Sequence, residues 1–481
     1  ILFRNYFVVS MENKKNELLR NLSLLAGIMI VAGSMIGSGI FKKPATMAGQ
    51  LLSPELLIAI WVIAGLITLV GALINAEIAC MIDDTGGQYM YFKKMYGDFV
   101  AYLYGWSILS VIQTGSQAAI AYIFAEYLGY FFEFPDAPGW MAEITVYMPL
   151  VGDIYPFAEF GTKMVAIIAL LFITGINIIG VFFGGVVQTI VTVVKIGSIM
   201  LLALILLFFG EGNIGNLTNG FAIQPEVSSN IIAVIGLALA GGFWAYDGWN
   251  NVTFVAGEVK NPQRNIPLSL FWGTVIVIVV YVVVNVAFLY VFPVEEMQHH
   301  SLVGAAAAEK IFGPLGGSII SIAVIISTFG ALNGSILATA RVQYAMAKTR
   351  LFFSSLGKVH PKYKTPHISL AVQGLWSAVL VLTGSFDTIT DYVIFAAWLF
   401  YMLGAAGIFV LRKKMKETPR PFKMKGYPVL PALFVIFSFL FLLNTIISDT
   451  QNAMMGVILV ISGLPVYFYR KYFDKKNNEI V

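Results

Sequence analysis

The sequence predicts an all-α integral membrane protein whose chain crosses the bilayer twelve times. Of its 481 residues, 58% are hydrophobic and only 12% are charged, whereas about a quarter of the residues of soluble domains are charged. Long apolar runs recur from residue 22 to residue 470 with no polar block between them. This composition excludes an ordinary soluble protein and favours one continuous membrane domain.

Twelve segments have the roughly 20 apolar residues that a membrane-spanning helix needs. They cover residues 22–50, 55–82, 98–132, 163–182, 184–209, 230–257, 267–292, 316–346, 366–384, 388–411, 428–447 and 452–470. Only glycines separate the fourth segment from the fifth. We expect a cytoplasmic segment over residues 1–21, in which no function is assigned to residues 1–10.

The charge pattern predicts that both chain ends lie in the cytoplasm. The protein would then be a multi-pass protein of the cell (inner) membrane. Basic residues of short loops favour the cytoplasmic side. Most of the lysines and arginines lie in the loops that would then be cytoplasmic, within residues 4–20, 93–94, 260–264, 341–364, 412–425 and 470–476. The predicted outer loop over residues 133–162 is acidic instead. Since the basic residues do not line a groove, the net charge of +4 gives no support to nucleic-acid binding.

Two of the predicted spans carry helix-breaking residues near the middle. The first contains "GSMIGSG" at residues 33–39, and the sixth contains "GGFWAYDGWNN" at residues 241–251. Glycine and aspartate are poor helix formers, and an unpaired backbone group in hydrocarbon is costly unless it lines a cavity. Breaks five spans apart suggest an inverted repeat with discontinuous helices 1 and 6. We expect one repeat over residues 22–210, a second over 211–411, and helices 11 and 12 with the cytoplasmic C-terminus over 412–481.

A packing role for the first break is the alternative, because Gly33 and Gly37 form a GxxxG pattern. The matching break in the sixth span favours a binding site.

A broken helix suits a zwitterionic amino acid. The carboxylate would accept from the amides of Gly37, Ser38 and Gly39 at a positive helix end, and the ammonium would donate to carbonyls near Met35, Ile36 and Trp244. Glycine lets the backbone approach the ligand closely. An α-amino acid is therefore a predicted substrate, and membrane lipids are the other predicted partners.

The predicted substrate-binding set also includes residues of the sixth span, namely Trp244, Ala245, Asp247 and Asn250. Trp244 and Tyr246 are predicted gates, although an aromatic side chain in such a chain is more often packing. Asp247 would bind a ligand amine, face water, or bond the unwound backbone, and the backbone role ranks highest. Asn250, Asn251 and Asn333 could each donate polar contacts within the bundle. Structural hydrogen bonds between helices are an equally good explanation for these three residues.

Lys195 lies near the middle of the fifth predicted span and should point into the bundle, because a charge at the bilayer centre is costly. As the predicted coupling residue it would either carry a proton or act as a fixed cation in the place of a coupling sodium. A structural bridge to carbonyls of the broken helices is the alternative. The sequence offers no metal-binding pattern, and no cofactor is expected.

Five segments in order resemble the amino acid-polyamine-organocation transporters, most closely the L-type amino acid transporters and bacterial serine/threonine exchangers. They begin at residues 33, 187, 243, 329 and 461 and read "GSMIGSGIF", "VQTIVTVVK", "FWAYDGWNNVTFVAGEVKNPQRNIPLSL", "FGALNGSILATAR" and "ISGLPVYFY". The resemblance implies a LeuT-type fold of 5+5 inverted repeats and sodium-independent transport, commonly by exchange. It also implies that the turn at residues 37–39 binds the carboxylate, that Met35 and Ile36 bind the ammonium, that Trp244 gates, and that Lys195 takes a sodium's place.

The sequence departs from the family pattern at Trp244, where phenylalanine is common, and at Asp247, where glycine is common. The bulkier gate and the extra acid favour alanine, serine or threonine over large aromatic substrates. Animal relatives tether a heavy subunit through a cysteine between the third and fourth spans. Residues 133–162 contain no cysteine, and Cys80 is the only one in the chain, so no disulfide-linked heavy subunit is expected.

Three functions therefore compete: an exchanger of small neutral amino acids, a proton-coupled symporter that uses Lys195, and, remotely, a membrane-embedded enzyme.

Overall fold

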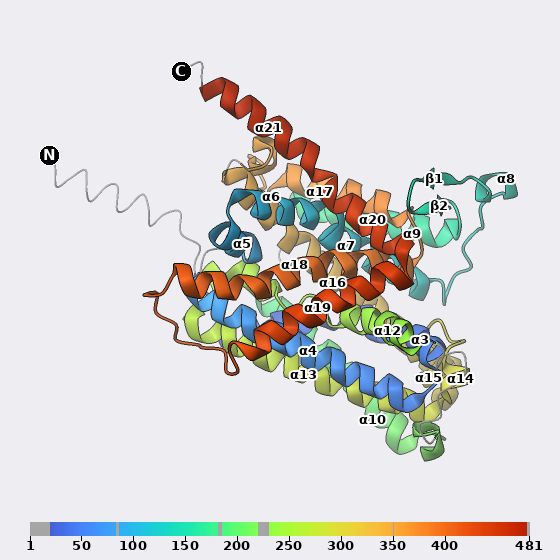
Figure 1. The fold of residues 1–481 in the computed structure, drawn as a ribbon. Helices are drawn as coiled ribbons and strands as arrows, with labels where there is room; N and C mark the ends of the chain where they lie inside the picture. Colours follow the sequence, from blue (N-terminus) through green and yellow to red (C-terminus); the bar gives the residue numbers. More distant parts are fainter. Residues whose placement is uncertain (1–19, 83–85, 181–184, 220–229, 350, 479–481) are drawn as a thin grey trace.

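The computed structural model describes residues 20–82, 86–180, 185–219, 230–349 and 351–478, and almost all of its regular structure is helical (Figure 1). The elements of the first half are α2 (Leu24–Met35), α3 (Gly39–Leu51), α4 (Pro54–Met81), α5 (Gln88–Tyr96), α6 (Asp98–Ser107), the π-helical turn η1 (Ile108–Ile112), α7 (Gln113–Leu128), α8 (Gly139–Ala142), β1 (Val146–Met148), β2 (Gly152–Ile154), α9 (Phe160–Ile179), α10 (Gly185–Phe209) and the 3₁₀ turn η2 (Ile214–Leu217).

The second half continues the helical bundle. Its elements are α12 (Ile231–Ala245), the 3₁₀ helix η3 (Asn251–Glu258), α13 (Pro262–Val291), α14 (Val294–Met297), α15 (Val303–Phe312), α16 (Pro314–Lys348), the 3₁₀ turn η4 (Ser354–Gly357), α17 (His367–Val381), α18 (Phe386–Lys414), α19 (Val429–Ser448), α20 (Thr450–Ile461) and α21 (Gly463–Asn478).

Helices occupy all twelve predicted segments, which confirms a helical multi-pass membrane protein. Nine helical stretches in the described residues are long and apolar enough to cross a bilayer, and the bent pair α2–α3 makes a tenth. The other two segments contain the shorter apolar helices α12 and α17, of 15 residues each. The count of twelve crossings stays a prediction, and so do the limits of the two repeats. Residues 1–19 and 181–184, on which the N-terminal segment and the boundary between the fourth and fifth spans were placed, lie outside the described residues.

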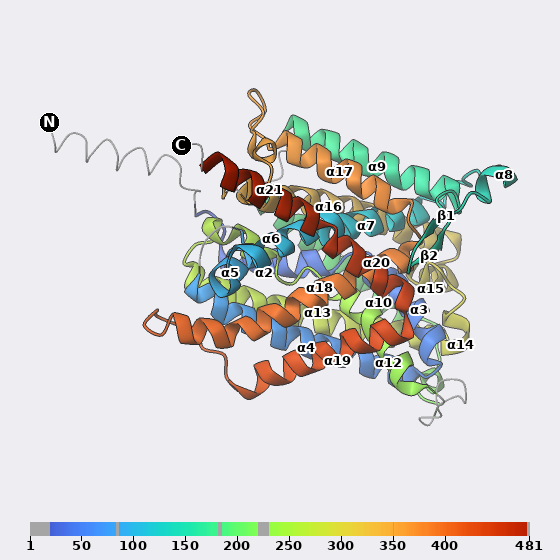
Figure 2. The ribbon, with the colours of Figure 1, turned by 45° about the horizontal axis from the view of Figure 1, so that its top comes forward.

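A small antiparallel hairpin is the exception to the all-α prediction. Strands β1 and β2 pair with Val146 opposite Ile154 and Met148 opposite Gly152. The hairpin, α8 and α14 lie at one end of the bundle, and α21 and the C-terminal end of α18 point to the other (Figures 1 and 2). We call these ends the hairpin face and the terminal face. A short hairpin in a connecting loop carries little of the alternating pattern that predicts a strand.

Several helices begin with a serine or aspartate N-cap. The side chains of Ser23, Ser53 and Ser385 accept hydrogen bonds from backbone amides three residues further on, at the starts of α2, α4 and α18. Asp449 does the same at the start of α20. These caps satisfy amides that a helix start leaves unpaired.

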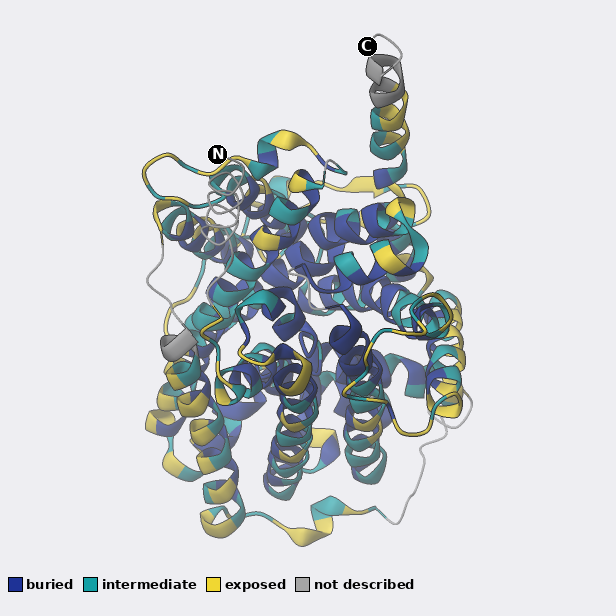
Figure 3. Cartoon of the chain, turned by 90° about the vertical axis from the view of Figure 1, so that its left-hand side faces the viewer, coloured by how far each residue is buried: buried dark blue, intermediate teal, exposed yellow. Residues whose placement is uncertain are grey.

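The helices bury one side and expose apolar residues on the other. Seen from the left-hand side of Figure 1, buried residues fill the middle of the bundle, and exposed residues lie on its periphery and in loops (Figure 3). Phe208, Phe209 and Ile232 are each 76% exposed. A soluble monomer rarely exposes so many large apolar residues, so these surfaces face lipid.

The two broken spans run antiparallel and in contact. Leu22, ahead of α2, pairs with Val259 after η3, and Lys43 and Met47 of α3 lie against Gly241 of α12. Their breaks therefore meet in the interior of the bundle.

Candidate substrate site

The first break separates α2 from α3. Ile36 ends α2 in an extended conformation (φ −73°, ψ 94°), and the chain turns by 41° before α3 begins at Gly39. Within the described part of the chain, the amides of Gly37 and Ser38 donate no backbone hydrogen bond. Because the amides at a helix start carry a partial positive charge, this turn forms an anion-binding position.

The second break lies between α12 and η3, over residues 246–250. Gly248 has φ +92°, a conformation that disfavours other residues. A Cβ atom at Gly248 would lie 3.1 Å from Ser34, and one at Gly39 would lie 2.6 Å from Cα of Ala245. Glycine at these two positions therefore allows the breaks to touch.

Tyr281 of α13 connects the two breaks, and the sequence reasoning missed it. Its hydroxyl oxygen lies 2.7 Å from the carbonyl oxygen of Met35 and 2.9 Å from that of Ala245. Both carbonyls belong to the last turns of half-helices, where a helix leaves carbonyls unpaired. A single tyrosine in the run "VIVIVVYVVVNVAF" was the available signal, because a polar group in an apolar span needs a partner.

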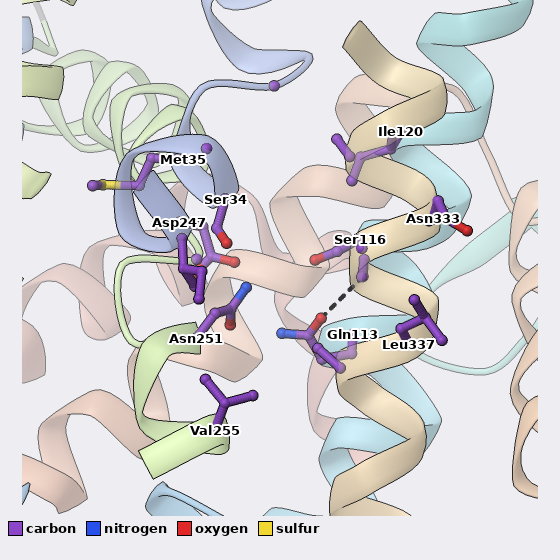
Figure 4. A pocket seen from close by; sticks show the side chains of 18 of the residues that line it. Ser34, Met35, Gln113, Ser116, Ile120, Asp247, Asn251, Val255, Asn333 and Leu337 are labelled. Atoms are coloured by element: carbon purple, nitrogen blue, oxygen red, sulfur yellow. Dashed lines mark hydrogen bonds between the residues drawn. The ribbon is translucent and has the colours of Figure 1, made fainter. Parts of the chain in front are cut away.

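A cavity of about 270 Å³ lies beside the breaks. Six of the predicted site residues line it: Met35, Gly37, Ser38, Gly39, Trp244 and Asp247. Spans three and eight form the opposite wall, which includes Gln113, Ser116, Ile120, Asn333 and Leu337 (Figure 4). The sequence reasoning did not find Gln113 or Ser116.

Four other predicted site residues are buried and do not line this cavity: Ile36, Ala245, Tyr246 and Asn250. The ring of Tyr246 packs against Trp61 and Tyr281, and its hydroxyl donates to the carbonyl of Trp61. The carbonyl of Asn250 accepts from the amide and hydroxyl of Thr253. In this conformation these contacts are structural.

The two glycines of the GxxxG pattern in the first span both line the cavity. Gly33 also packs directly against Thr192 of α10, where a Cβ atom would clash. Among the described residues other than its chain neighbours, the nearest atom to a Cβ atom at Gly37 would be the carbonyl oxygen of Met35, at 3.9 Å. Packing therefore accounts for glycine at position 33, and Gly37 is open to the cavity.

Lys195 points into the bundle as predicted. It is 7% exposed, and its ammonium donates to the carbonyl of Ile36 over 2.7 Å. This contact places a cation at the C-terminal, partly negative end of α2. The contact is compatible with two of the predicted roles of Lys195: a structural bridge to a carbonyl of the broken helix, and a fixed cation in the place of a coupling sodium.

Asp247 lies in the cavity wall, where the hydroxyl of Tyr401 on α18 donates to its Oδ1 over 2.6 Å. This contact with Tyr401 was not predicted. The predicted role of Asp247 in bonding the local backbone stays a prediction. Asn333 shows the predicted interhelical bonding, because its Oδ1 accepts from Asn177 on α9 over 2.8 Å.

The hairpin-face side of the site is closed by an ion-paired cluster that we call the lock, made of Lys43, Asp387 and Asp391. The Lys43 ammonium, which is almost completely buried, lies 2.6 Å from Asp387 and 3.5 Å from Asp391. Phe386 packs edge-on against Trp244, with ring centroids 5.8 Å apart. The lock therefore joins α3 to α18 directly beyond the cavity residue Trp244.

Within the described ranges, a partly exposed ion pair lies on the terminal-face side of the cavity. Arg341 and Glu258 both line the cavity, and their charged groups lie 3.2 Å apart. The Arg341 side chain is 47% exposed. The cavity therefore opens toward the terminal face in this conformation.

A helical bundle with a polar cavity between two broken spans is the architecture of a membrane transporter for small solutes. The sequence pattern of the amino acid permease family matches residues 22–464. The chain belongs to this family and is an amino acid transporter.

Curated relatives match over nearly the whole chain. The serine/threonine exchanger SteT of Bacillus subtilis is 31% identical over 464 residues, which cover 96% of this chain and 99% of SteT. The human b(0,+)-type amino acid transporter 1 is 31% identical, with 96% of this chain and 90% of the relative covered. The mouse large neutral amino acids transporter small subunit 2 is also 31% identical, with 95% and 82% covered. All of these relatives are transporters, which argues against the membrane-embedded enzyme.

Proposed function

We propose that this transporter exchanges small neutral L-amino acids of the alanine, serine and threonine type across the plasma membrane. The observation that carries the proposal is the contact of two broken helices at a small cavity. There the amides of Gly37 and Ser38, which donate to no backbone group in the described ranges, lie beside Met35 and Trp244. These groups complement the carboxylate and ammonium of an amino acid. The SteT relative, described as a serine/threonine exchanger, supports the substrate class and the exchange mode.

The substrate carboxylate would accept from the turn at Gly37 and Ser38, and the ammonium would donate to the carbonyl of Met35. Trp244 would shield the bound amino acid on the hairpin-face side. Transport would alternate between the conformation described, open to the terminal face, and one in which the lock opens. Alternating access requires that the cavity is never open to both faces at the same time.

The position of Lys195 supports sodium-independent transport. Its ammonium lies at the end of α2 and donates to the carbonyl of Ile36. A coupling sodium ion at this position would instead be coordinated by backbone carbonyl oxygens. A tethered cation supplies the charge without a gradient, so the driving force comes from the counter-transported amino acid.

We also propose that the terminal face is cytoplasmic. Basic residues gather there, among them Lys260, Arg264, Lys348 and Arg412, in agreement with the preference of cytoplasmic loops for positive charge. No disulfide-linked heavy subunit is expected, because Cys80 is buried near the terminal-face end of α4, at the other end of the span from the hairpin face.

Counterflow in proteoliposomes tests the exchange mode. Labelled serine should accumulate when unlabelled serine or alanine is trapped inside, and should enter empty vesicles far more slowly. Uptake into empty vesicles driven by an imposed pH gradient would instead support the proton symporter. One observation favours that second function: within the described residues, the buried Lys195 ammonium has no carboxylate partner, so no ion pair would have to break when it loses a proton.

A further inference from the structure

A π-helical turn interrupts the third span directly before the cavity wall. The amide of Gln113 donates to the carbonyl of Ile108, five residues earlier, and the hydroxyl of Thr114 donates to the carbonyl of Leu109 over 2.7 Å. A π turn holds one residue more than an α turn, which rotates the side chains that follow by roughly 100°. The turn therefore sets which face of α7 the cavity meets, and that face presents Gln113 and Ser116.

The side-chain amide of Gln113 is held at its oxygen and free at its nitrogen. The Ser335 hydroxyl on α16 lies 3.2 Å from Oε1 and donates to it. The hydroxyl of Thr339 also lies nearby, at 3.4 Å, but its single proton is better placed for the carbonyl of Ser335, at 2.8 Å. Nε2 donates to no residue in the described ranges, and it points across the cavity toward Asn251 (Figure 4).

Gln117, one helical turn further along α7, has a partner at both its nitrogen and its oxygen. Its Nε2 donates to Thr339 over 3.3 Å, and its Oε1 accepts from Ser377 over 3.1 Å. Gln117 is fully buried and does not line the cavity. Two glutamines of one helix therefore differ in the feature that matters for a ligand, which is an unused donor facing open space.

We propose that Gln113 determines specificity by donating a hydrogen bond to an oxygen on the substrate side chain, so that the transporter prefers serine and threonine to alanine. This inference rests on the proposed function. An amino acid whose carboxylate and ammonium bind the broken helices directs its side chain away from them, toward the wall formed by α7 and α16. There the hydroxyl of serine meets the Nε2 donor, whereas alanine leaves that donor unpaired.

The size of the preference follows from the type of hydrogen bond. A bond between uncharged groups contributes about 0.5–1.5 kcal/mol. A site with a fixed donor also discriminates against a ligand that lacks the acceptor. The middle of this range, about 0.7–1.4 kcal/mol, corresponds to a preference for serine over alanine of about three- to ten-fold in kcat/KM.

The test is the ratio of kcat/KM for serine to that for alanine, measured by exchange in proteoliposomes for the wild type, Gln113→Leu, Gln113→Met and Gln117→Leu. Both substitutions at Gln113 should lower the ratio by about three- to ten-fold, mainly by reducing serine transport. Gln117→Leu should leave the ratio within two-fold of wild type even if less protein folds, because both substrates are measured on the same preparation.

An unchanged ratio in both Gln113 variants, or an equal fall in Gln117→Leu, would overturn the inference and leave the proposed function standing. A wild-type protein that exchanges neither amino acid would overturn the proposed function, and the inference with it.

Discussion

Removing the lysine of the lock should open the hairpin face. In Lys43→Met, the carboxylates of Asp387 and Asp391 lose the ammonium that lies 2.6 and 3.5 Å from them. Their side chains are 35% and 25% exposed in the closed arrangement, so most of their surface is shielded from water. Separation of α3 from α18 would hydrate both groups, and the conformation open to the hairpin face should become more populated.

The magnitude follows from the burial of the three groups. Removing one partner of a fully buried ion pair costs about 3–5 kcal/mol. Because the two carboxylates retain part of their exposure, about 2–3 kcal/mol is the appropriate range here, and 1.4 kcal/mol corresponds to a factor of ten in an equilibrium constant. The ratio of hairpin-face-open to terminal-face-open protein should therefore rise by about 30- to 150-fold.

Thiol labelling measures this ratio directly. Cys80 is the only cysteine, so Cys80→Ala with Ile120→Cys places one thiol in the cavity wall. In Lys43→Met, a membrane-impermeant maleimide added on the hairpin-face side should react much faster, and on the terminal-face side more slowly. Lys310→Met is the control, because Lys310 is 40% exposed in its pair with Glu296 and such pairs contribute little.

A second substitution separates the lock from general damage. Asp387→Asn in the Lys43→Met background removes one of the uncompensated charges and should return the labelling ratio part of the way toward wild type. If Lys43→Met lowers thermal stability while labelling from both faces stays unchanged, the cluster only stabilises the fold and the reasoning is wrong.

Three further substitutions test the site. Lys195→Ala removes the ammonium from the carbonyl of Ile36 and should abolish or uncouple transport in protein that still elutes as a folded species; normal exchange kinetics would refute the coupling role. Gly39→Ala would place a Cβ atom 2.6 Å from Cα of Ala245, so the breaks must separate, and serine binding in a thermal-shift assay should be lost. Tyr281→Phe removes one hydroxyl and should lower the free energy of unfolding by about 1 kcal/mol while slowing exchange more than it weakens binding; equal loss of both would argue against a link between the breaks.

The sequence predicted the helical segments and the two breaks because both depend on local composition. Apolar runs of sufficient length are expected to span the bilayer, and clusters of glycine with other poor helix formers, such as those around Gly37 and Gly248, lower helix propensity. The bend of α2–α3 and the turn after α12 confirm these breaks. The β1–β2 hairpin was missed because it depends on the conformation of one connecting loop.

The missed site residues depend on contacts between segments far apart in the chain. Tyr281 lies 246 residues from Met35, and Tyr401 lies 154 residues from Asp247, so neither pairing has a local signal. Gln113 reaches the cavity because a π turn precedes it, and a single sequence does not show such a turn. Composition therefore predicted the side of the site formed by the broken helices. The opposite wall, formed by α7 and α16, depends on tertiary packing that a single sequence does not show.

The contacts around the first break also revise how the ammonium of the substrate would be held. The carbonyl of Ile36 already accepts from Lys195 and does not line the cavity, whereas the carbonyl of Met35 belongs to a residue that does. A carbonyl oxygen has two lone pairs, so the oxygen of Met35 can accept from Tyr281 and from a substrate ammonium together. Substrate binding at Met35 would then compete with or adjust the bond that joins the two half-helices. If the substrate binds as proposed, the same oxygen would belong both to the binding site and to the contact through Tyr281 between α2 and α12, and a bound amino acid could then alter how the broken helices move.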